Sequence, residues 1–191
     1  MVAARLRTLA RRGVELAGGA LARAQVARFA RATAGRHTVV LDIDNTLADS
    51  WPTFLRSWAS EAERLAAIEP LPHIKAVAHD GPVDAGAAVL FLSHRDLRRR
   101  GTTIAWLQRH GFAAGTDNVV LVARPDDKLA HLRRLADGRR LEVWDDLTAR
   151  HETGQMVRYD QLTARIGALA LTHHGWDDIV AITGRGLDRP V

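Results

Sequence analysis

The sequence predicts an α/β protein built around a parallel β-sheet. From residue 38 onward, short apolar runs alternate with segments of helical periodicity, which is the pattern of β-α-β units. Hydrophobic residues make up 47% and charged residues 26% of the 191 residues, as in ordinary globular proteins. We therefore expect a folded chain with about one domain. Polar residues follow several of the predicted strands, where open α/β sheets bind their ligands.

The first 36 residues form a basic arm that precedes the α/β pattern. Residues 1–36 hold eight arginines against the single acid Glu15, whereas the rest of the chain carries 19 basic and 21 acidic side chains. Apolar residues near helical spacing, interrupted by Gly18-Gly19, predict two short amphipathic helices. Such a segment suits a solvated or partner-covered helix, and a membrane surface or nucleic acid would also attract it. We divide the chain into this arm (1–36) and one domain (37–191).

The predicted strands are short runs of buried character. Thr38-Val39-Val40-Leu41 is apolar and β-branched, and similar runs follow along the chain. The further predicted strands are 88–92, 118–122, 141–144 and a possible short strand at 178–182.

Helical periodicity separates these strands. A helix that begins near Trp51 should end at Glu69-Pro70, because proline interrupts the helical hydrogen bonds. Residues 70–86, rich in Pro and Gly, are expected to form a loop, and a helix over 103–110 should stop at Gly111. Further helices are expected over 126–136 and 159–171.

The predicted strand ends bring together the residue types of a metal and phosphate site. Asp42 and Asp44 are two apart after the first strand, so their side chains share one face, and Asp145-Asp146 follows the fourth strand. Carboxylates this close repel one another unless a cation lies between them. Oxygen ligands in a chain without cysteine favour Mg²⁺ and exclude thiolate metal sites and a disulfide scaffold. An EF-hand is excluded, since its sixth position requires Gly and Leu47 stands there.

Cationic and hydroxyl groups complete this predicted site. Ser93 ends the second strand and is followed by His94 and Arg95, while Lys128 begins the helix after the third strand. These groups would hold the oxygens of an oxyanion. A carboxylate nucleophile, a divalent cation, a hydroxyl and a lysine together describe a phosphoryl-transfer site.

In this order the residues resemble the four motifs of the haloacid dehalogenase-like superfamily. VVLDIDNTLADS is similar to the first motif, FLSHRD to the second, Lys128 within RPDDKLAHL to the third and EVWDDL to the fourth, so the resemblance covers residues 38–147. It implies a Rossmann-like three-layer parallel sheet with a minimal helical cap, which we place at 51–86, and an N-terminal helical arm. His94 departs from the small residue that is common after the second-motif hydroxyl.

The resemblance also implies a role for each matching residue. Asp42 would be the nucleophile that forms an aspartyl-phosphate, and Asp44 the general acid and then the general base. The substrate would be held by the polar set Thr46, Ser93, His94, Arg95 and Lys128. Magnesium would be bound by Asp42, the main-chain carbonyl of Asp44, Asp145 and Asp146. For Arg95 a surface ion pair with Asp96 is the alternative, and for Asp146 a helix N-cap.

These observations predict a Mg²⁺-dependent phosphomonoester hydrolase. Only about 41 residues separate Thr46 from the second strand, too few for a large cap, so the site should be open to bulky substrates. The segment from Ser93 to Phe112 is similar to that of the acid phosphatase and polynucleotide 3′-phosphatase branches. One alternative is therefore a polynucleotide 3′-phosphatase whose basic arm holds nucleic acid, and another is a non-catalytic interaction protein. The partner would be a small phosphorylated molecule or a nucleic-acid end, with a protein or membrane surface for the arm.

Three further expectations concern location and the remaining charged residues. No apolar run is long enough to span a bilayer, so we expect a cytoplasmic protein. The pairs His151-Glu152 and His173-His174 lack a second ligand pair at metal spacing and are interpreted as surface residues. The Arg98-Arg99-Arg100 run is interpreted as a solvated helix start.

Overall fold

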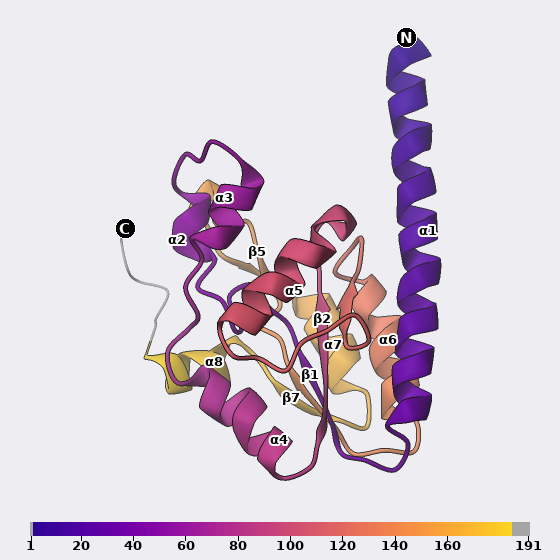
Figure 1. The fold of residues 1–191 in the computed structure, drawn as a ribbon, viewed down its shortest axis with the longest axis vertical. Coiled ribbons are helices and arrows are strands. Elements are labelled where there is room, and N and C mark those ends of the chain that lie inside the picture. The colour runs from indigo at the N-terminus through magenta and orange to yellow at the C-terminus, as the bar shows by residue number, and fades with distance from the viewer. Residues whose placement is uncertain (1, 185–191) are drawn as a thin grey trace.

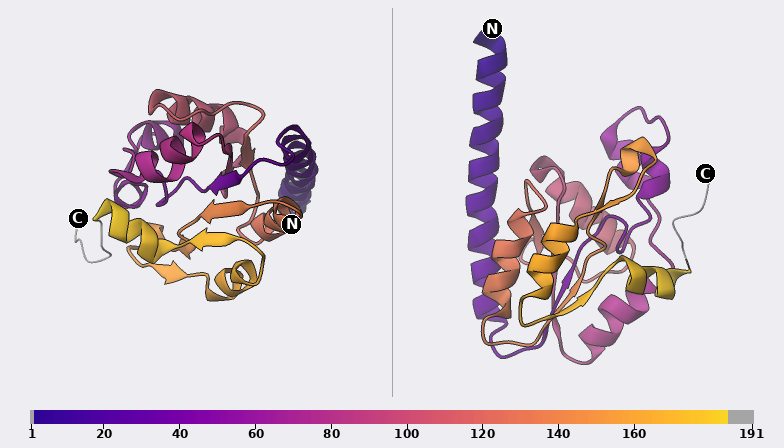
Figure 2. Two further views of the ribbon diagram at one scale, coloured as in Figure 1. Left: turned by 90° about the horizontal axis from the view of Figure 1, so that it is seen from below. Right: turned by 180° about the vertical axis from the view of Figure 1, so that it is seen from behind.

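A five-stranded parallel sheet forms the centre of the molecule, as a computed structural model that describes residues 2–184 shows (Figures 1 and 2). The strand order is β3-β2-β1-β4-β7, and all four pairings are parallel. The strands are β1 (Thr38–Leu41), β2 (Ala88–Ser93), β3 (Val119–Leu121), β4 (Leu141–Trp144) and β7 (Thr172–His174). The predicted α/β class with a parallel sheet is confirmed, and the first four predicted strands lie where expected.

Alternate residues of the central strands enter two separate hydrophobic cores. Val39 and Leu41 belong to one core, whereas Val40 of the same strand belongs to the other. This alternation follows from the two-residue period of a strand. Both faces are apolar because helices cover both, as parallel sheets require.

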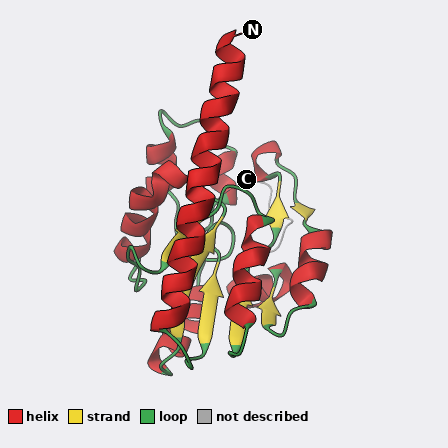
Figure 3. Cartoon of the chain, turned by 90° about the vertical axis from the view of Figure 1, so that its right-hand side faces the viewer, coloured by secondary structure: helices red, strands yellow, loops and turns green. Residues whose placement is uncertain are grey.

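Helices from distant parts of the chain cover the two faces (Figure 3). One face packs against α5 (Arg100–Arg109), α8 (Trp176–Thr183) and the 3₁₀ and π turns described below. The opposite face packs against α1 (Val2–Ala32), α6 (Asp127–Ala136) and α7 (Asp160–Gly167). Helix α5 ends just before Gly111, whose φ of 77° is the left-handed conformation expected at a helix C-terminus, so that predicted stop is confirmed.

The basic arm is one continuous helix, α1, and the predicted break at Gly18-Gly19 is wrong. A Cβ atom on Gly18 would lie 2.0 Å from Leu97 Cδ1, so glycine allows α1 to pass close to the turn η2 (Leu97–Arg99). Val26, Phe29 and Ala30 of the same helix are buried in the core. This packing outweighs the low helix propensity of the two glycines.

The helical turns between β1 and β2 are distributed differently from the prediction. The predicted helix from Trp51 is divided into α2 (Trp51–Phe54) and α3 (Glu61–Ala66), where the Ser60 hydroxyl caps the second by accepting from the Glu63 N–H. The predicted loop 70–86 is wrong, since it contains the π-helix η1 (Ala76–Asp80) and α4 (Gly81–Asp84). Its His79 is buried and accepts a hydrogen bond from the Ala113 N–H, which fixes the π turn against the body.

The C-terminal strand prediction is also wrong, because residues 178–182 lie within α8. The Asp178 carboxylate accepts from the Gly175 N–H at the start of this helix, and Ile179 and Thr183 bury one helical face. The edge strand is instead β7, which begins directly after the predicted helix 159–171, and the helix in that range, α7, stops at Gly167. No helix among residues 2–184 is long and apolar enough to cross a membrane.

Candidate active site

A pocket of about 380 Å³ opens at the carboxyl ends of the central strands. Strand β1 leads into Asp42, β2 ends at Ser93 and β4 leads into Asp145, so the parallel pairing brings these residues to one edge of the sheet. Helix α6 adds Lys128 from its first turn. The structure thereby brings together eight of the nine predicted site residues as lining of one pocket: Asp42, Asp44, Ser93, His94, Arg95, Lys128, Asp145 and Asp146.

Three buried carboxylates form the floor of this pocket. Asp42, Asp145 and Asp146 each offer an oxygen within 4.8 Å of the others, and each is no more than 6% exposed. Burial, together with the charges of Asp42 and Asp145, raises the pKa of Asp146 well above its ordinary value. Buried carboxylate oxygens that lie this close together are typical ligands of a hard divalent cation. The residues therefore fit a metal ion, and Asp146 caps no helix, since the element that follows it is the short strand β5 (Thr148–Ala149).

Lys128 is the cation that lies among these carboxylates in the described structure. Its Nζ lies 2.7 Å from Asp145 Oδ2 and 3.1 Å from Asp42 Oδ1, with only 5% of the side chain exposed. Burial lowers the pKa of Lys128, but the charges of Asp145 and Asp42 raise it more, so the amine stays protonated. One positive charge against three carboxylates leaves the floor negative.

Asp42 is a second carboxylate of this floor with a raised pKa. Burial raises the pKa of Asp42, Lys128 lowers it and Asp145 raises it again, with a result of about 6. A carboxyl group with a raised pKa in the folded protein stabilises the fold less once pH exceeds its unfolded value of 3.8. At neutral pH the metal-free protein therefore carries a cost at this residue of about 3 kcal/mol.

This imbalance predicts that Asp42→Asn stabilises the metal-free protein. In EDTA at pH 7 the variant should have a free energy of unfolding about 3 kcal/mol above that of the parent chain, and the difference should vanish near pH 4. Urea titrations at several pH values measure it. The difference between the two proteins is the informative quantity, because histidines with lowered pKa such as His94 make both chains less stable at acid pH. A variant less stable than the parent at pH 7 would contradict the prediction.

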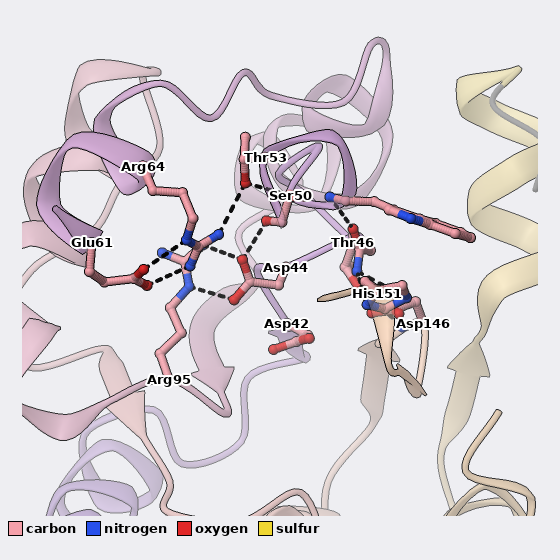
Figure 4. A network of polar contacts seen from close by, with 12 residues as sticks. Asp42, Asp44, Thr46, Ser50, Thr53, Glu61, Arg64, Arg95, Asp146 and His151 are labelled. Carbon is pink, nitrogen blue, oxygen red and sulfur yellow. Dashed lines mark hydrogen bonds and ion pairs between the residues drawn. The ribbon is translucent and has the colours of Figure 1, made fainter. Parts of the chain in front are cut away.

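Asp44 points away from the carboxylate floor and is held by a cation and a hydroxyl (Figure 4). Arg95 donates from Nε to Asp44 Oδ2 at 2.6 Å and from Nη2 to Oδ1 at 2.7 Å, and the Ser50 hydroxyl also donates to Oδ1. Burial raises the pKa of Asp44, but the charge and hydrogen bonds of Arg95 lower it further, so the net shift is downward. Arg95 therefore does not pair with Asp96, whose carboxylate binds Arg98 instead.

Ser93 and His94 lie on the wall between these two groups. The Ser93 hydroxyl is buried beside Asp42, with which it interacts. His94 is exposed at the pocket, and burial of part of its ring together with the charge of Lys128 lowers its pKa. A neutral imidazole at this position adds no charge to the pocket.

Thr46 is the predicted residue that does not line the pocket. Its hydroxyl is completely buried and donates to Asp146 Oδ1 at 3.0 Å while accepting from the Asp146 N–H. Thr46 thus fixes the position of a candidate metal ligand. Thr148 fixes the other oxygen of Asp146 through its hydroxyl.

The interpretation of His151 as a surface residue is wrong. It is 5% exposed, lines the pocket, and lies within hydrogen-bond distance of Asn45 Nδ2 (3.0 Å) and Thr148 Oγ1 (2.9 Å). Its ring also lies 4.9 Å from that of Trp51. His173 and His174 are half-buried rather than exposed, since His174 stacks on Trp144 with ring centroids 3.9 Å apart.

The insert supplies a second group of pocket residues that the sequence did not single out. Arg64 of α3 binds Glu61 through Nε at 2.8 Å and Nη2 at 2.5 Å and donates to the Thr53 hydroxyl at 3.0 Å. Arg99, interpreted as solvated, also lines the pocket. The only available signal was the helical spacing of Glu61 and Arg64, which is equally typical of a surface ion pair.

Comparison with known proteins identifies the architecture. No protein-family model matches the chain, and no curated protein matches it in sequence. The crystal structure of the class C acid phosphatase from Bacillus anthracis with tungstate bound matches with a TM-score of 0.50 at 14% sequence identity, over 93% of this chain and 84% of that chain. The chain is similar in fold to that acid phosphatase.

A second structure of the class C acid phosphatase from Bacillus anthracis has a TM-score of 0.48 at 16% identity, over 88% of this chain and 81% of that chain. The acid phosphatase fold agrees with the three-layer α/β architecture expected from the haloacid dehalogenase-like resemblance. At this identity the likeness is one of fold alone.

Proposed function

We propose that the chain is a Mg²⁺-dependent phosphomonoesterase that works through an aspartyl-phosphate at Asp42. The observation that carries this proposal is the meeting of three buried carboxylates, Lys128 and the Ser93 hydroxyl around one pocket at the carboxyl edge of the sheet. The acid phosphatase fold supports it. Asp42, Asp145 and Asp146 with the main-chain carbonyl of Asp44 would hold the cation. When bound, the cation would neutralise charge on the carboxylates and on a phosphoryl group.

In this mechanism an Asp42 oxygen attacks phosphorus while the bond to the leaving-group oxygen breaks. Ser93 and Lys128 would bind the phosphoryl oxygens, with Lys128 also tempering the charge of Asp42. Asp44 would deliver a proton to the departing oxygen and then take one from the water that hydrolyses the aspartyl-phosphate. Its lowered pKa favours the second of these tasks. Arg95 would orient Asp44 through its two hydrogen bonds.

The direct test is phosphate release from p-nitrophenyl phosphate by the complete chain. Mg²⁺ should support turnover, EDTA should abolish it, and added Mg²⁺ should restore it, because the negative floor cannot bind a phosphate ester without a cation. Colorimetric measurement of p-nitrophenol and inorganic phosphate checks this. Failure of Mg²⁺, Mn²⁺ and Co²⁺ alike to support turnover would favour the non-catalytic interaction protein.

The position of α1 favours a second candidate, a polynucleotide 3′-phosphatase. In Figures 1 and 3 the N-terminal half of α1 extends beyond the body on the side where the strands end, which is the side of the pocket. The sequence of that half holds Arg5, Arg7, Arg11 and Arg12 before its first acid, Glu15. A basic helix beside the pocket could hold the phosphate backbone of a nucleic acid whose 3′-phosphate reaches Asp42.

For this candidate, replacing the four arginines with glutamine should weaken turnover of a 3′-phosphorylated oligonucleotide. The salt dependence of binding falls with each phosphate that the protein no longer neutralises, so the slope of log KM against log salt should fall by up to about 3. The matched control changes the exposed Arg133 and Arg134 of α6 to glutamine. An unchanged salt slope in the four-arginine variant would exclude the nucleic-acid candidate and leave the phosphomonoesterase proposal intact.

A further inference from the structure

We propose that the pocket contains a second anion subsite, formed by Arg64, Arg95 and Arg99, which binds a phosphate or carboxylate carried by the leaving group. This inference rests on the proposed phosphomonoesterase function and specifies its substrate class. The three arginines line one wall of the pocket beside Asp44, apart from the carboxylate floor that would hold the cation.

Arg95 brings an unpartnered donor to this wall. Its Nε and Nη2 bind Asp44, but Nη1 has no hydrogen-bond partner in the described structure, although the side chain is only 5% exposed. A buried charged donor without a partner costs free energy, and a ligand oxygen would remove that cost. This donor is the group of Arg95 that an anion entering the pocket would satisfy in the proposed subsite.

Arg64 is held in place to face the same region. Its guanidinium lies over the Phe54 ring at 4.2 Å and donates to Thr53, while two nitrogens bind Glu61 (Figure 4). The charge of Arg64 lowers the pKa of Asp44 after the larger effects of burial, Arg95 and Ser50, and the charge of Glu61 raises the pKa of Arg95. The two arginine groups are thus close enough to act on one ligand.

Arg99 adds a positive charge beside the ion pairs of Arg95 with Asp44 and of Arg64 with Glu61. It is half-buried at the end of η2, and its side chain forms no hydrogen bond or ion pair with a described residue. The charge of Arg99 acts on Glu61 and Asp96. With Arg98, which pairs with Asp96, four guanidinium groups stand against the three carboxylates Asp44, Glu61 and Asp96. The wall therefore carries a surplus positive charge, whereas the carboxylate floor is negative without a cation.

The place of this wall determines which part of the substrate it contacts. In the proposed mechanism Asp44 protonates the departing oxygen, so the leaving group lies on the Asp44 side of phosphorus. Arg95 binds Asp44 directly, and Arg64 and Arg99 line the same side. A leaving group with its own anionic group would meet three guanidinium donors there, while a neutral leaving group would leave Arg95 Nη1 unpartnered.

A matched substrate series tests the subsite. We would measure kcat and KM with Mg²⁺ for phenyl phosphate, 3-carboxyphenyl phosphate and 1,3-phenylene bisphosphate, the last corrected for its two equivalent phosphates. The anionic leaving groups should give kcat/KM values about tenfold higher, mainly through KM, because a charge-assisted hydrogen bond contributes roughly that factor. A larger preference for the bisphosphate than for the carboxylate would assign the natural group as phosphate.

Three variants test the subsite further. We expect a weaker preference for anionic leaving groups in one, a stronger preference in the second and no change in the third. Arg99→Gln should reduce the preference for the anionic leaving groups several-fold, and Glu61→Gln, which frees Arg64, should increase it. Arg98→Gln removes the same charge one residue away, from a side chain that is 82% exposed, and should keep the preference of the parent chain. Because Glu61→Gln predicts a gain, loss of folding cannot produce the expected pattern.

The outcomes separate this inference from the function on which it rests. Absence of turnover for phenyl phosphate and p-nitrophenyl phosphate would overturn the phosphomonoesterase proposal. Turnover with equal kcat/KM for neutral and anionic leaving groups, or equal effects of Arg98→Gln and Arg99→Gln, would overturn the second anion subsite alone.

Discussion

Asp42→Asn should reduce Mg²⁺-dependent phosphate release by at least about 10³-fold, because the amide cannot act as the nucleophile. The change keeps the volume of the side chain and its place after β1, where the Asp42 N–H donates to the Trp144 carbonyl at 2.8 Å. Initial rates with p-nitrophenyl phosphate at saturating Mg²⁺ measure the effect. The same variant should be more stable than the parent chain without metal, so loss of activity would not reflect loss of the fold.

A matched control for this experiment is Asp137→Asn, at an exposed position after α6. It makes the same chemical change away from the pocket and should leave turnover within about twofold of the parent, as surface substitutions generally do. Comparable turnover by Asp42→Asn and the parent chain would remove Asp42 as the nucleophile. The carboxylates at 145 and 146 would then remain only as a cation site.

Lys128→Met should lower the free energy of unfolding in EDTA by about 3–5 kcal/mol. The substitution keeps an unbranched side chain of similar size but leaves Asp42 and Asp145 buried without the ammonium that lies 3.1 Å and 2.7 Å away. Added Mg²⁺ should recover part of the loss, since a bound cation compensates the same carboxylates. Urea denaturation with EDTA and with Mg²⁺ gives the two values.

Lys75→Met provides the control, because Lys75 is the other lysine of the chain and also binds an aspartate. Its partner Asp80 is 41% exposed, so loss of that ion pair should cost at most about 1 kcal/mol and should not respond to Mg²⁺. Equal losses for the two variants would contradict the assignment of Lys128 to the carboxylate floor.

The sequence predicted the site best where a polar residue directly follows a predicted strand. Asp42, Ser93 and Asp145 each follow an apolar run, and parallel pairing of those runs sufficed to place them at one pocket. Lys128 could be placed because it begins the helix after the third strand. These predictions needed only the period of the elements and the rule that parallel strands end at the same edge.

Partnerships between distant segments could not be predicted in this way. The sequence offers two partners for Arg95, a substrate phosphate and Asp96. Nothing in the sequence indicates that its guanidinium binds Asp44, 51 positions earlier. His151 is interpreted as a surface residue because no second ligand pair stands at metal spacing from it, yet it is buried against Asn45, 106 positions away. Such contacts depend on how the insert and the loop after β4 pack, which local spacing does not determine.

The errors in secondary structure have the same origin. Gly18-Gly19 would interrupt an isolated helix, but close packing against Leu97 favours small residues there. The β-branched residues of α8 would favour a strand, but Ile179 and Thr183 are buried on one helical face. In each case tertiary packing outweighed local propensity.

The unbroken course of α1 also has a geometric consequence. At 1.5 Å per residue its 31 residues extend about 46 Å, and Ala22, Val26, Phe29 and Ala30 of its C-terminal part are anchored in the core. A rod of this kind keeps whatever engages its far end at a set separation from the mouth of the pocket. Each residue added or deleted near Leu16 would change that separation by about 1.5 Å and rotate the far end about the helix axis by about 100°. Distance and orientation would therefore change together.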